Sequence, residues 1–324
     1  MSFHARFDRA VARLATPLGK LYPDGFGREL DARVAQLKDF SIGDEPAFVR
    51  WSPTRRVLGV PVRRGQFNSP AAHYLPSESR VGVVEHWDAG ANAPLCLVLA
   101  ATAEEGFARR GPLARYLVAQ GLSVLLLENP FYGARRPHGQ RGPMLRTVAD
   151  QFAMNTATVE EACALLRTFH ASGLEVGVTG YSQGGVMAAF AAALSDYALS
   201  VVPRGAARAS GPIFTGGALS DTIRWDVLGR EAGSEAAAGA RFDEALSWVR
   251  LDRHAPPRDA SRAILVAGED DGYIPAAEAE ALHRHWPGSE LRWTRGGHLT
   301  GLVLHHDVHR RAILDAFARR RAAR

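Results

Sequence analysis

The stretch Glu175-Val-Gly-Val-Thr-Gly-Tyr-Ser-Gln-Gly-Gly-Val-Met-Ala-Ala-Phe190 joins a strand pattern to a helix pattern through a G-x-S-x-G pentapeptide. Its β-branched residues before Gly180 favour a buried strand, and the alanine-rich run after Gly185 favours a closely packed helix. Ser182 lies in the sharp turn between them, where glycines leave room for neighbouring backbone. The stretch therefore predicts a serine nucleophile on a strained strand-to-helix turn.

The chain around this turn alternates strand and helix patterns. Continuous apolar runs predict strands at residues 95–100, 122–127, 199–202, 263–267 and 291–294, and helical periodicity predicts helices at residues 108–120, 145–171, 276–286 and 299–320. Unbroken apolar strands separated by helices indicate a mostly parallel sheet that is covered by helices on both faces. Residues 57–62 and 80–87 are expected to form an antiparallel lead-in to this sheet. The predicted fold class is α/β.

Two further segments complete the predicted organisation. Residues 1–50 carry two helical patterns and are expected to form an N-terminal helical extension of a domain that spans residues 51–324. Residues from about 211 to 260 lose the strand and helix alternation, and long insertions of this kind in compact domains are usually functional covers. We therefore expect a cap at about 211–260.

Composition excludes several classes of protein. With 324 residues and 46% hydrophobic content the chain can bury a large core. The net charge of +5 is almost wholly due to arginine and is not organised into a basic run with interleaved aromatics, so nucleic acid is not an expected partner. Cys96 and Cys163 lie in apolar patterns typical of core residues, and no run approaches the length of a membrane span. A cytoplasmic protein is expected.

The first helical pattern is amphipathic and basic. Phe3, Phe7, Val11 and Leu14 recur at helical spacing with arginines between them. One interpretation is an accessory helix docked on the main domain, and the other is peripheral contact with a membrane surface.

Three loops after predicted parallel strands carry residues suited to nucleophilic catalysis, in the order Ser182, Asp271, His298. Functional groups of open parallel sheets collect at the carboxyl ends of the strands, and this order is that of α/β-hydrolases. His298 would accept the serine proton and return it to the leaving group, and Asp271 would orient the imidazole. Asp270 is the alternative acid, because it is adjacent to Asp271.

A tetrahedral oxyanion requires backbone donors. One is expected from Gln183, directly after the nucleophile, and the other from the loop after the first parallel strand. Thr102 is favoured for this second donor, with Ala101 and Ala103 as neighbouring alternatives.

The chain resembles the family of α/β-hydrolase domain-containing protein eighteen over roughly residues 50 to 310. The resemblance rests on Leu99-Ala-Ala-Thr-Ala-Glu-Glu-Gly-Phe107 with Arg109-Arg110, on Leu127-Glu-Asn-Pro-Phe-Tyr-Gly-Ala-Arg-Arg-Pro137, on Gly177-Val-Thr-Gly-Tyr-Ser-Gln-Gly-Gly185 and on Phe214-Thr-Gly-Gly-Ala-Leu-Ser220. The first loop of the family usually reads Gly-Thr-Gly-Asp, whereas Ala101-Thr-Ala-Glu104 stands here. The resemblance implies an α/β-hydrolase fold and a serine hydrolase, with lipid acyl esters among its candidate substrates.

Further residues are candidates for substrate binding or for metal binding. Arg135 follows a strand end and could bind an anionic head group or fix its loop by ion pairs, while Phe214 and Trp225 could line an acyl pocket in the cap. His305 and His309 have a spacing seen in metal sites but lack a third ligand, so no metal is expected.

The function expected from these residues is hydrolysis of carboxylic esters through an acyl-serine intermediate, without a cofactor. Two alternatives remain at this point. One is an acyltransferase or peptidase that uses the same three residues, and the other is a non-enzymatic binding protein built on the hydrolase fold.

Overall fold

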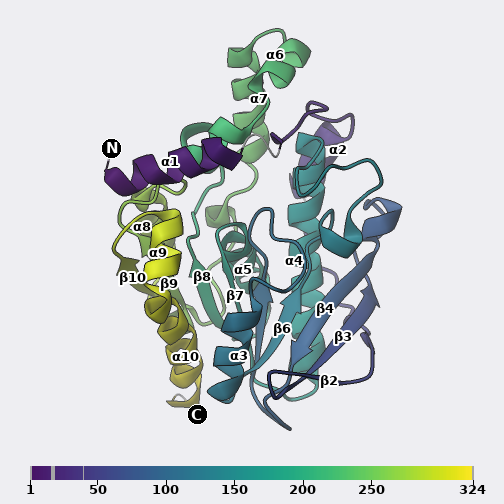
Figure 1. The fold of residues 1–324 in the computed structure, drawn as a ribbon, viewed down its shortest axis with the longest axis vertical. Helices are drawn as coiled ribbons and strands as arrows, with labels where there is room; N and C mark the ends of the chain where they lie inside the picture. Colours follow the sequence, from purple (N-terminus) through teal and green to yellow (C-terminus); the bar gives the residue numbers. More distant parts are fainter. Residues whose placement is uncertain (1, 16–18, 39, 323–324) are drawn as a thin grey trace.

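A computed structural model describes residues 2–15, 19–38 and 40–322 (Figure 1). In these residues, ten strands form one mixed sheet in the order β1-β3-β4-β6-β5-β7-β8-β9-β10, with β2 paired to β3. The parallel part contains β5 (Leu95–Leu99), β6 (Ser123–Leu127), β7 (Val176–Tyr181), β8 (Ser200–Arg204), β9 (Ile264–Gly268) and β10 (Glu290–Thr294). The predicted α/β class and mostly parallel sheet are confirmed.

The first strands of the sheet are antiparallel, as predicted, but their boundaries differ from the prediction. They are β1 (Arg50–Trp51), β2 (Arg55–Val57), β3 (Val60–Asn68) and β4 (Val81–Trp87). The single strand predicted over residues 57–62 is wrong, because Leu58 and Gly59 both adopt positive φ and turn the chain into a tight hairpin. Leucine is uncommon in that conformation, so the residue types did not indicate a turn there.

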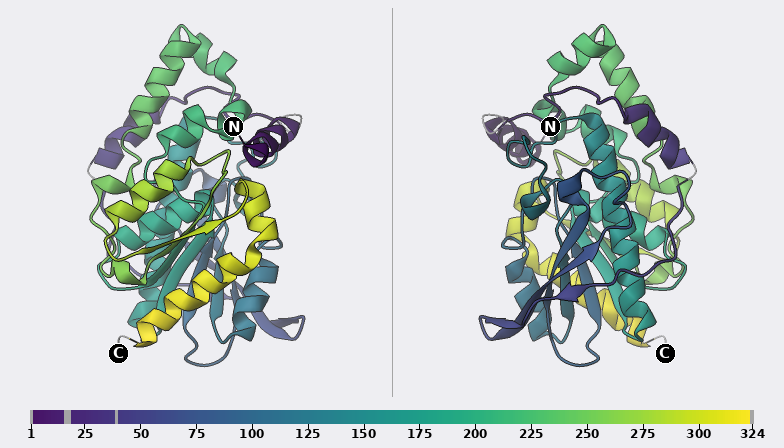
Figure 2. Two further views of the ribbon diagram at one scale, coloured as in Figure 1. Left: turned by 90° about the vertical axis from the view of Figure 1, so that its left-hand side faces the viewer. Right: turned by 90° about the vertical axis from the view of Figure 1, so that its right-hand side faces the viewer.

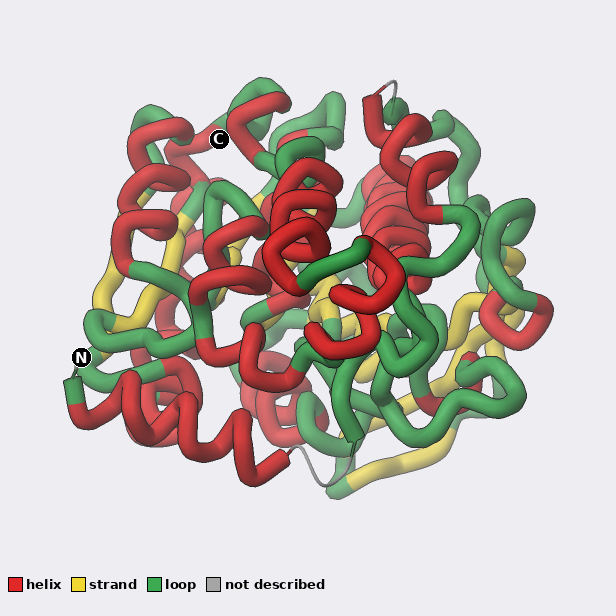
Figure 3. The backbone as a smooth tube through the Cα atoms, turned by 90° about the horizontal axis from the view of Figure 1, so that it is seen from above, coloured by secondary structure: helices red, strands yellow, loops and turns green. Residues whose placement is uncertain are grey.

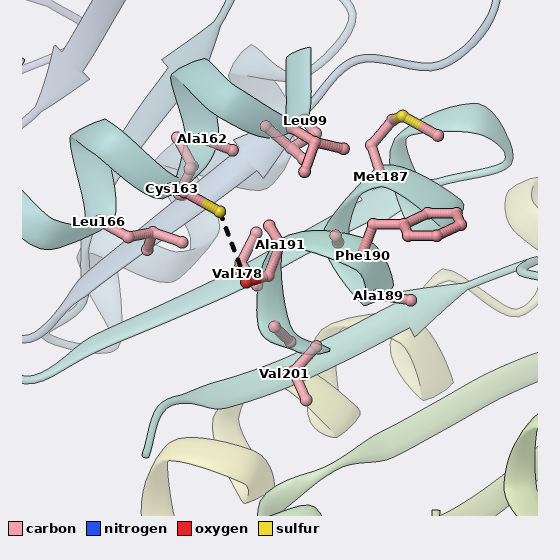
Figure 4. Close-up of a cluster of buried hydrophobic side chains, with 14 of the residues drawn as sticks. Leu99, Ala162, Cys163, Leu166, Val178, Met187, Ala189, Phe190, Ala191 and Val201 are labelled. Atoms are coloured by element: carbon pink, nitrogen blue, oxygen red, sulfur yellow. Dashed lines mark hydrogen bonds between the residues drawn. The ribbon is translucent and has the colours of Figure 1, made fainter. Parts of the chain in front are cut away.

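Helices cover both faces of the parallel strands (Figure 2). α3 (Gly111–Ala119) and α10 (His306–Ala322) pack on one face, and α4 (Val148–Ala171), α5 (Gln183–Ala193) and α8 (Ala276–His285) pack on the other. Figure 4 shows the core between the sheet and the face covered by α4 and α5, where Cys163 of α4 lies among side chains of β5, β7, β8 and α5. The Cys163 thiol donates to the carbonyl oxygen of Ala191 at 3.7 Å. Because both faces are covered, every residue of β5, β6, β8 and β9 is buried.

The segment between β8 and β9 forms a series of short helices, of which those that contain residues 212–246 lie above the carboxyl ends of the strands. The series comprises η4 (Pro212–Gly216), η5 (Ala218–Thr222), α6 (Trp225–Ala232), α7 (Glu235–Leu246), η6 (Leu251–Arg253) and η7 (Ala260–Arg262). The N-terminal segment joins this layer, because α1 (Phe3–Ala15) packs against η5 and α2 (Leu30–Lys38) packs against α4. Figure 3, seen from above, shows α1 along one edge of this layer. The boundaries at residues 50, 211 and 260 remain predictions.

The last helical region is divided. α9 (His298–Leu304) is followed by a turn at His305, and α10 begins at His306. The continuous helix predicted from residue 299 to 320 is therefore wrong at this break. Two short 3-10 turns, η2 (Ser77–Ser79) and η3 (Gly133–Arg135), lie in the loops after β3 and β6. None of the described helices combines the length and the apolar character needed to cross a bilayer.

Candidate active site

Ser182 lies on the turn between β7 and α5, as the sequence predicts. Its φ of 55° and ψ of −122° place a non-glycine residue in a strained conformation that presents the side chain above the sheet. Gly180 and Gly184 make the turn possible, because a Cβ on Gly180 would lie 2.2 Å from the carbonyl oxygen of Gly184. A Cβ on Gly184 would lie 2.5 Å from the carbonyl oxygen of Leu99 in β5. The backbone of the turn thus touches the neighbouring strand directly.

Asp271 and His298 meet above the ends of β9 and β10. His298 Nδ1 lies 2.6 Å from Asp271 Oδ2, and the other carboxylate oxygen accepts the amide hydrogens of Tyr273 and Ile274 at 2.8 Å each. The adjacent Asp270 is held differently, because its backbone amide donates to the carbonyl oxygen of Gly296. Of the two predicted alternatives, Asp271 is the one whose carboxylate contacts the imidazole.

The surroundings of His298 set the protonation behaviour of its ring. Burial alone lowers the pKa of His298, but the charge and hydrogen bond of Asp271, together with the charge of Asp8, outweigh it and raise the pKa above the ordinary value. The ring is also flanked by Tyr181 and Tyr273, each with its ring centroid 4.8 Å away. The Tyr181 hydroxyl donates to the backbone carbonyl of His298. These contacts fix the position of the imidazole.

Ser182 and His298 line the same cavity, which has a volume of about 530 Å³. Within the described residues no hydrogen bond joins their side chains, and bonds of this type often tighten only when substrate binds. The lining is largely apolar and includes Val11, Leu21, Met144, Met187, Ile213, Phe214 and Leu219. The volume and lining are typical of a site for a small organic ligand.

Two backbone amides beside Ser182 are suited to bind an oxyanion. Gln183 is the first residue of α5, so its amide has no acceptor within the helix. In the facing loop, the amide of Ala101 donates to Glu104 at 3.1 Å and that of Ala103 donates to the Tyr132 hydroxyl at 3.3 Å. Among the described residues the amide of Thr102, between them, donates to no acceptor, which leaves it as the available donor of the predicted three.

The loop achieves this arrangement with alanine where a glycine is usual in the family it resembles. Ala103 adopts a φ of 60°, in the left-handed region that favours glycine. The hydrogen bond from its backbone amide to the Tyr132 hydroxyl helps to hold it there. Ala101 has no such requirement, since its φ is not positive. Only one of the two alanines is therefore strained.

Sequence reasoning missed several polar residues that support the site. The side-chain amide of Gln183 donates to Asn155 Oδ1 at 2.6 Å, and Gln151 donates to the same oxygen at 2.9 Å. Both partners are on α4, where they interrupt an apolar pattern and could have been noticed. Asp8, which contacts the backbone around Asp271 and His298, left no comparable signal, because one acidic residue among arginines in a surface helix is ordinary.

Of the two interpretations of Arg135, substrate binding is wrong and the fixing of its loop by ion pairs is confirmed. Its side chain is completely buried and does not line the cavity, and its Nη1 donates to Glu161 Oε2 at 2.8 Å and to the carbonyl oxygen of Glu128 at 2.7 Å. Nη2 donates to the carbonyl oxygen of Ser79 at 2.7 Å. A guanidinium that is committed to an internal carboxylate and two carbonyls fixes its loop and does not reach the cavity.

The two predicted aromatic positions in the cap differ. Phe214 lines the cavity, as expected for a residue that meets substrate. Trp225 does not reach it, because its ring packs 6.0 Å from that of Phe242 inside the cap and its indole nitrogen donates to the carbonyl oxygen of Ser220. The prediction for Trp225 is therefore corrected to a packing role.

Of the histidines near residue 305, His305 lies in the turn between α9 and α10, whereas His306 and His309 are both on α10. Burial lowers the pKa of His309 to about 3, and its ring lies beside Tyr181. In the part of the chain that the structure describes, no group of three or more His, Cys, Asp or Glu side chains is arranged to hold a metal ion.

Comparison with known proteins is consistent with this geometry. A family model described as Alpha/beta hydrolase domain containing 18 matches residues 30–239 and 230–319, which together span most of the chain. The chain belongs to this family. The match includes the serine turn, the cap and the loops that carry Asp271 and His298.

Solved structures share the fold at low sequence identity. The acetyl xylan esterase from Paenibacillus sp. R4 is 14% identical, with a TM-score of 0.57 over 91% of this chain and 96% of that chain. Acetyl Xylan Esterase 1 from Thermoanaerobacterium sp. JW/SL YS485 is 13% identical, with a TM-score of 0.55 over 98% and 99%. At this identity the similarity establishes the α/β-hydrolase fold.

Proposed function

We propose that this protein hydrolyses carboxylic esters through an acyl-Ser182 intermediate. The observation that carries the proposal is the 2.6 Å contact between His298 Nδ1 and Asp271 Oδ2 in the cavity that Ser182 lines. Three residues from separate loops with these roles constitute a nucleophile, a base and an orienting acid. Family membership supports a hydrolase, and the names of the two structural neighbours support an esterase.

Each step of the proposed reaction uses a residue described above. His298 Nε2 takes the proton of the Ser182 hydroxyl as its oxygen attacks the ester carbonyl, while Asp271 holds the proton on Nδ1. The amides of Gln183 and Thr102 stabilise the oxyanion. His298 then protonates the leaving alcohol, and a water molecule, deprotonated by the same nitrogen, releases the acid from Ser182.

A fluorophosphonate probe tests the nucleophile directly. We expect the probe to label the wild-type protein and not Ser182→Ala. Folded wild-type protein that the probe does not label would support the non-enzymatic binding protein and contradict the proposal. Supplying an ester with competing alcohols, or a peptide in place of the ester, separates hydrolysis from acyl transfer and from peptidase activity by the product formed.

The apolar wall supports acyl chains as the part of the substrate that enters beneath the cap. A second cavity of about 50 Å³ adjoins the first and shares Met187 and Phe214 with it. Its other walls include Leu37, Phe152, Val159, Phe190, Leu246 and Trp248. A panel of p-nitrophenyl esters of increasing acyl length checks this assignment. We expect kcat/KM to rise with chain length, and highest activity on acetate would contradict it.

The outer face of α1 supports contact with a lipid surface. Phe3, Phe7 and Leu14 share one side of the helix and are 76%, 41% and 78% exposed. Val303 and Leu304 of α9, the helix beside α1, are 68% and 66% exposed. The arginines at positions 6 and 13 are also exposed, so the face combines apolar side chains with positive charge, which suits an anionic membrane surface.

Vesicle binding tests this part of the proposal. We expect the protein to sediment with phosphatidylcholine vesicles that contain phosphatidylglycerol, and the double variant Phe7→Ser, Leu14→Ser to sediment less. Leu58, another exposed apolar residue at a distant hairpin, provides the matched control Leu58→Ser. Equal binding by the double variant and the control would exclude α1 as the contact.

A cytoplasmic location remains part of the proposal. Cys96 and Cys163 are both buried and free, and burial raises the pKa of each thiol to about 12. Such thiols behave as core residues, which agrees with a reducing compartment.

A further inference from the structure

Asp8 is a buried acid on the inner face of α1. Its side chain has no exposed surface, and its carboxylate accepts three backbone amide hydrogens from two separate loops. Oδ2 accepts from Gly272 at 2.9 Å and from His298 at 2.7 Å, and Oδ1 accepts from Leu299 at 3.1 Å. The Asp8 side chain is thus hydrogen-bonded to the backbone of Gly272, which follows Asp271, and to the backbone of His298.

We propose that Asp8 is a positioning residue for the acid and histidine of the active site, and that α1 is the strap that carries it. This inference rests on the proposed function, because the value of holding the two loops lies in the proton transfer to His298. Asp8 touches neither substrate nor reacting atoms and acts through the backbone of the two loops.

The need for Asp8 arises from how α9 begins. The first amides of a helix have no acceptor within it and are usually satisfied by the side chain of the preceding residue. That residue is Gly297, which has no side chain, and Asp8 supplies the acceptor from 290 positions away. A carboxylate at the start of a helix also interacts favourably with the helix dipole.

The surrounding glycines are fitted to this carboxylate. A Cβ on Gly297 would lie 2.4 Å from Asp8 Oδ2, and a Cβ on Gly272 would lie 2.9 Å from Asp8 Cβ. Both loops therefore leave space that the side chain of Asp8 occupies. Among the described residues no cation pairs with Asp8, so the three amides are what compensates its buried charge.

Other attachments of α1 lead to α9, where His4 Nδ1 lies 3.2 Å from Thr300 Oγ1, and to the cap. Arg9 Nη2 donates to the carbonyl oxygen of Gly216 at 3.1 Å, and Arg13 pairs with Asp221 at 3.1 Å on the surface. The apolar residues Phe3, Phe7 and Leu14 face away from the protein, so they do not fasten the helix. Asp8 is consequently the buried polar anchor of α1 and joins the cap layer to the loops of Asp271 and His298.

The groups that face His298 are identified by their contacts. Asp271 from the loop after β9 and Asp8 from α1 both raise its pKa. Tyr181 from β7 and Tyr273 flank the ring of His298. The positive charge of His298 also lowers the pKa of His309 in α10. Removing the charge of Asp8 while leaving the others in place therefore has a defined effect on the histidine.

The variant Asp8→Asn tests the proposal. Its amide keeps one acceptor oxygen but turns an NH2 group toward backbone donors, which loosens the loops. We expect kcat on a soluble ester to fall about 10²-fold, as a small misplacement of catalytic groups does, with KM unchanged. The acid limb of kcat/KM should move to lower pH, because a charge that raises the pKa of His298 is lost. The matched control Asp221→Asn removes a surface ion pair of the same helix and should preserve both kcat and the limb.

Amide hydrogen exchange gives a readout that does not depend on activity. We expect exchange at Gly272, His298 and Leu299 to accelerate in Asp8→Asn, while amides of β5 and β7 keep their protection. If Asp8→Asn does not fold, Gly297→Ala displaces the carboxylate from the other side and should reproduce the same exchange and the same loss of kcat.

The outcomes separate this inference from the proposed function. Unchanged kcat and an unchanged acid limb in folded Asp8→Asn would overturn the positioning role, as would unchanged exchange at the three amides. If the fluorophosphonate does not label the wild-type protein, the proposed function fails and the positioning role in catalysis falls with it. If hydrogen exchange in Asp8→Asn is nevertheless faster at the three amides, the conclusion that Asp8 anchors the two loops still stands.

Discussion

The turn that carries Ser182 and the loops that carry Asp271 and His298 open into one cavity, but they are held in place differently. The turn is fixed by its own glycines and by adjacent strands: Gly184 lies against β5, and the amide of Ser182 donates to the carbonyl oxygen of Arg204 at 2.9 Å in β8. The loops are joined by a carboxylate that lies 264 to 291 positions away in the chain. One half of the site is built by local sterics and the other by a distant charge.

This difference determines which changes each half tolerates. The serine turn is sensitive to added volume, because its backbone is already in contact with the sheet. The loops are sensitive to loss of charge or of an acceptor, because buried amides and a buried imidazole depend on carboxylates. Substitutions chosen on that basis should distinguish the two halves.

The largest effect is expected in the loops, from Asp271→Asn. The amide would favour the wrong tautomer of His298, and we expect kcat to fall about 10⁴-fold. Asp270→Asn is the matched control, since its neighbour alone contacts the imidazole at 2.6 Å. Rates of ester hydrolysis by the two variants check this. An equal loss of kcat in Asp270→Asn would show that Asp271 had been wrongly assigned as the acid.

A smaller effect is expected in the turn, from Gly184→Ala. The added Cβ would meet the carbonyl oxygens of Leu99 and Ala100 at 2.5 and 2.7 Å, so α5 must move and carry the Gln183 amide with it. We expect kcat to fall about 10²-fold, the cost of losing one oxyanion donor, and stability to fall by about 1–3 kcal/mol.

Gly239→Ala in α7 is the control for that variant. A Cβ there meets no atom within 4 Å, and alanine favours helix, so stability should increase by about 0.5–1 kcal/mol. Denaturant unfolding measures both variants. Unchanged stability and activity in Gly184→Ala would show that the turn is not fixed by contact with β5.

The raised pKa of His298 leads to a pH dependence. The neutral imidazole is the base, so kcat/KM should fall about tenfold per pH unit below a pKa that lies above about 6.5. The folded state binds this proton more tightly than the unfolded state. Protonation of His298 therefore stabilises the fold below about pH 6.5, and this contribution is lost as pH rises through the folded pKa. An acid limb well below pH 6 would contradict the raised pKa.

The smallest effect is expected in the loop opposite Ser182, from Ala103→Gly. A left-handed alanine costs about 1–2 kcal/mol, and glycine recovers part of this at the cost of a more flexible unfolded chain. We expect a net gain of about 0.5–1 kcal/mol in stability with activity retained. Ala101→Gly, where φ is not positive, should lose stability instead, and thermal unfolding of the pair measures the contrast.

The parts predicted from sequence are those that depend on neighbouring residues. The parallel strands follow from unbroken apolar runs, and the turn around Ser182 follows from its glycines between a strand and a helix pattern. The loop order also placed Asp271 and His298 on adjacent strand ends, where the structure brings them together.

The parts that sequence reasoning missed depend on contacts between distant segments. For Arg135 the sequence left substrate binding and loop-fixing ion pairs both open, because nothing near it in the chain identifies its partner Glu161 on α4. The apolar pattern of α1 left docking on the domain and membrane contact both open, whereas in the structure Phe3, Phe7 and Leu14 are exposed and the docked face carries Asp8. Which face of a helix is buried depends on what it packs against, and the helix sequence does not contain that information.

The link between Asp8 and the loop of His298 also concerns the order in which the chain is made. A ribosome that adds 5–20 residues per second needs about 15–60 s to synthesise the segment between them. Once α1 has left the ribosome, it spends the rest of that interval without the loops that it later fastens. Because the first helix completes a site built by the last strands, the site is assembled only after synthesis of His298, and incomplete chains that already carry Ser182 remain without their base.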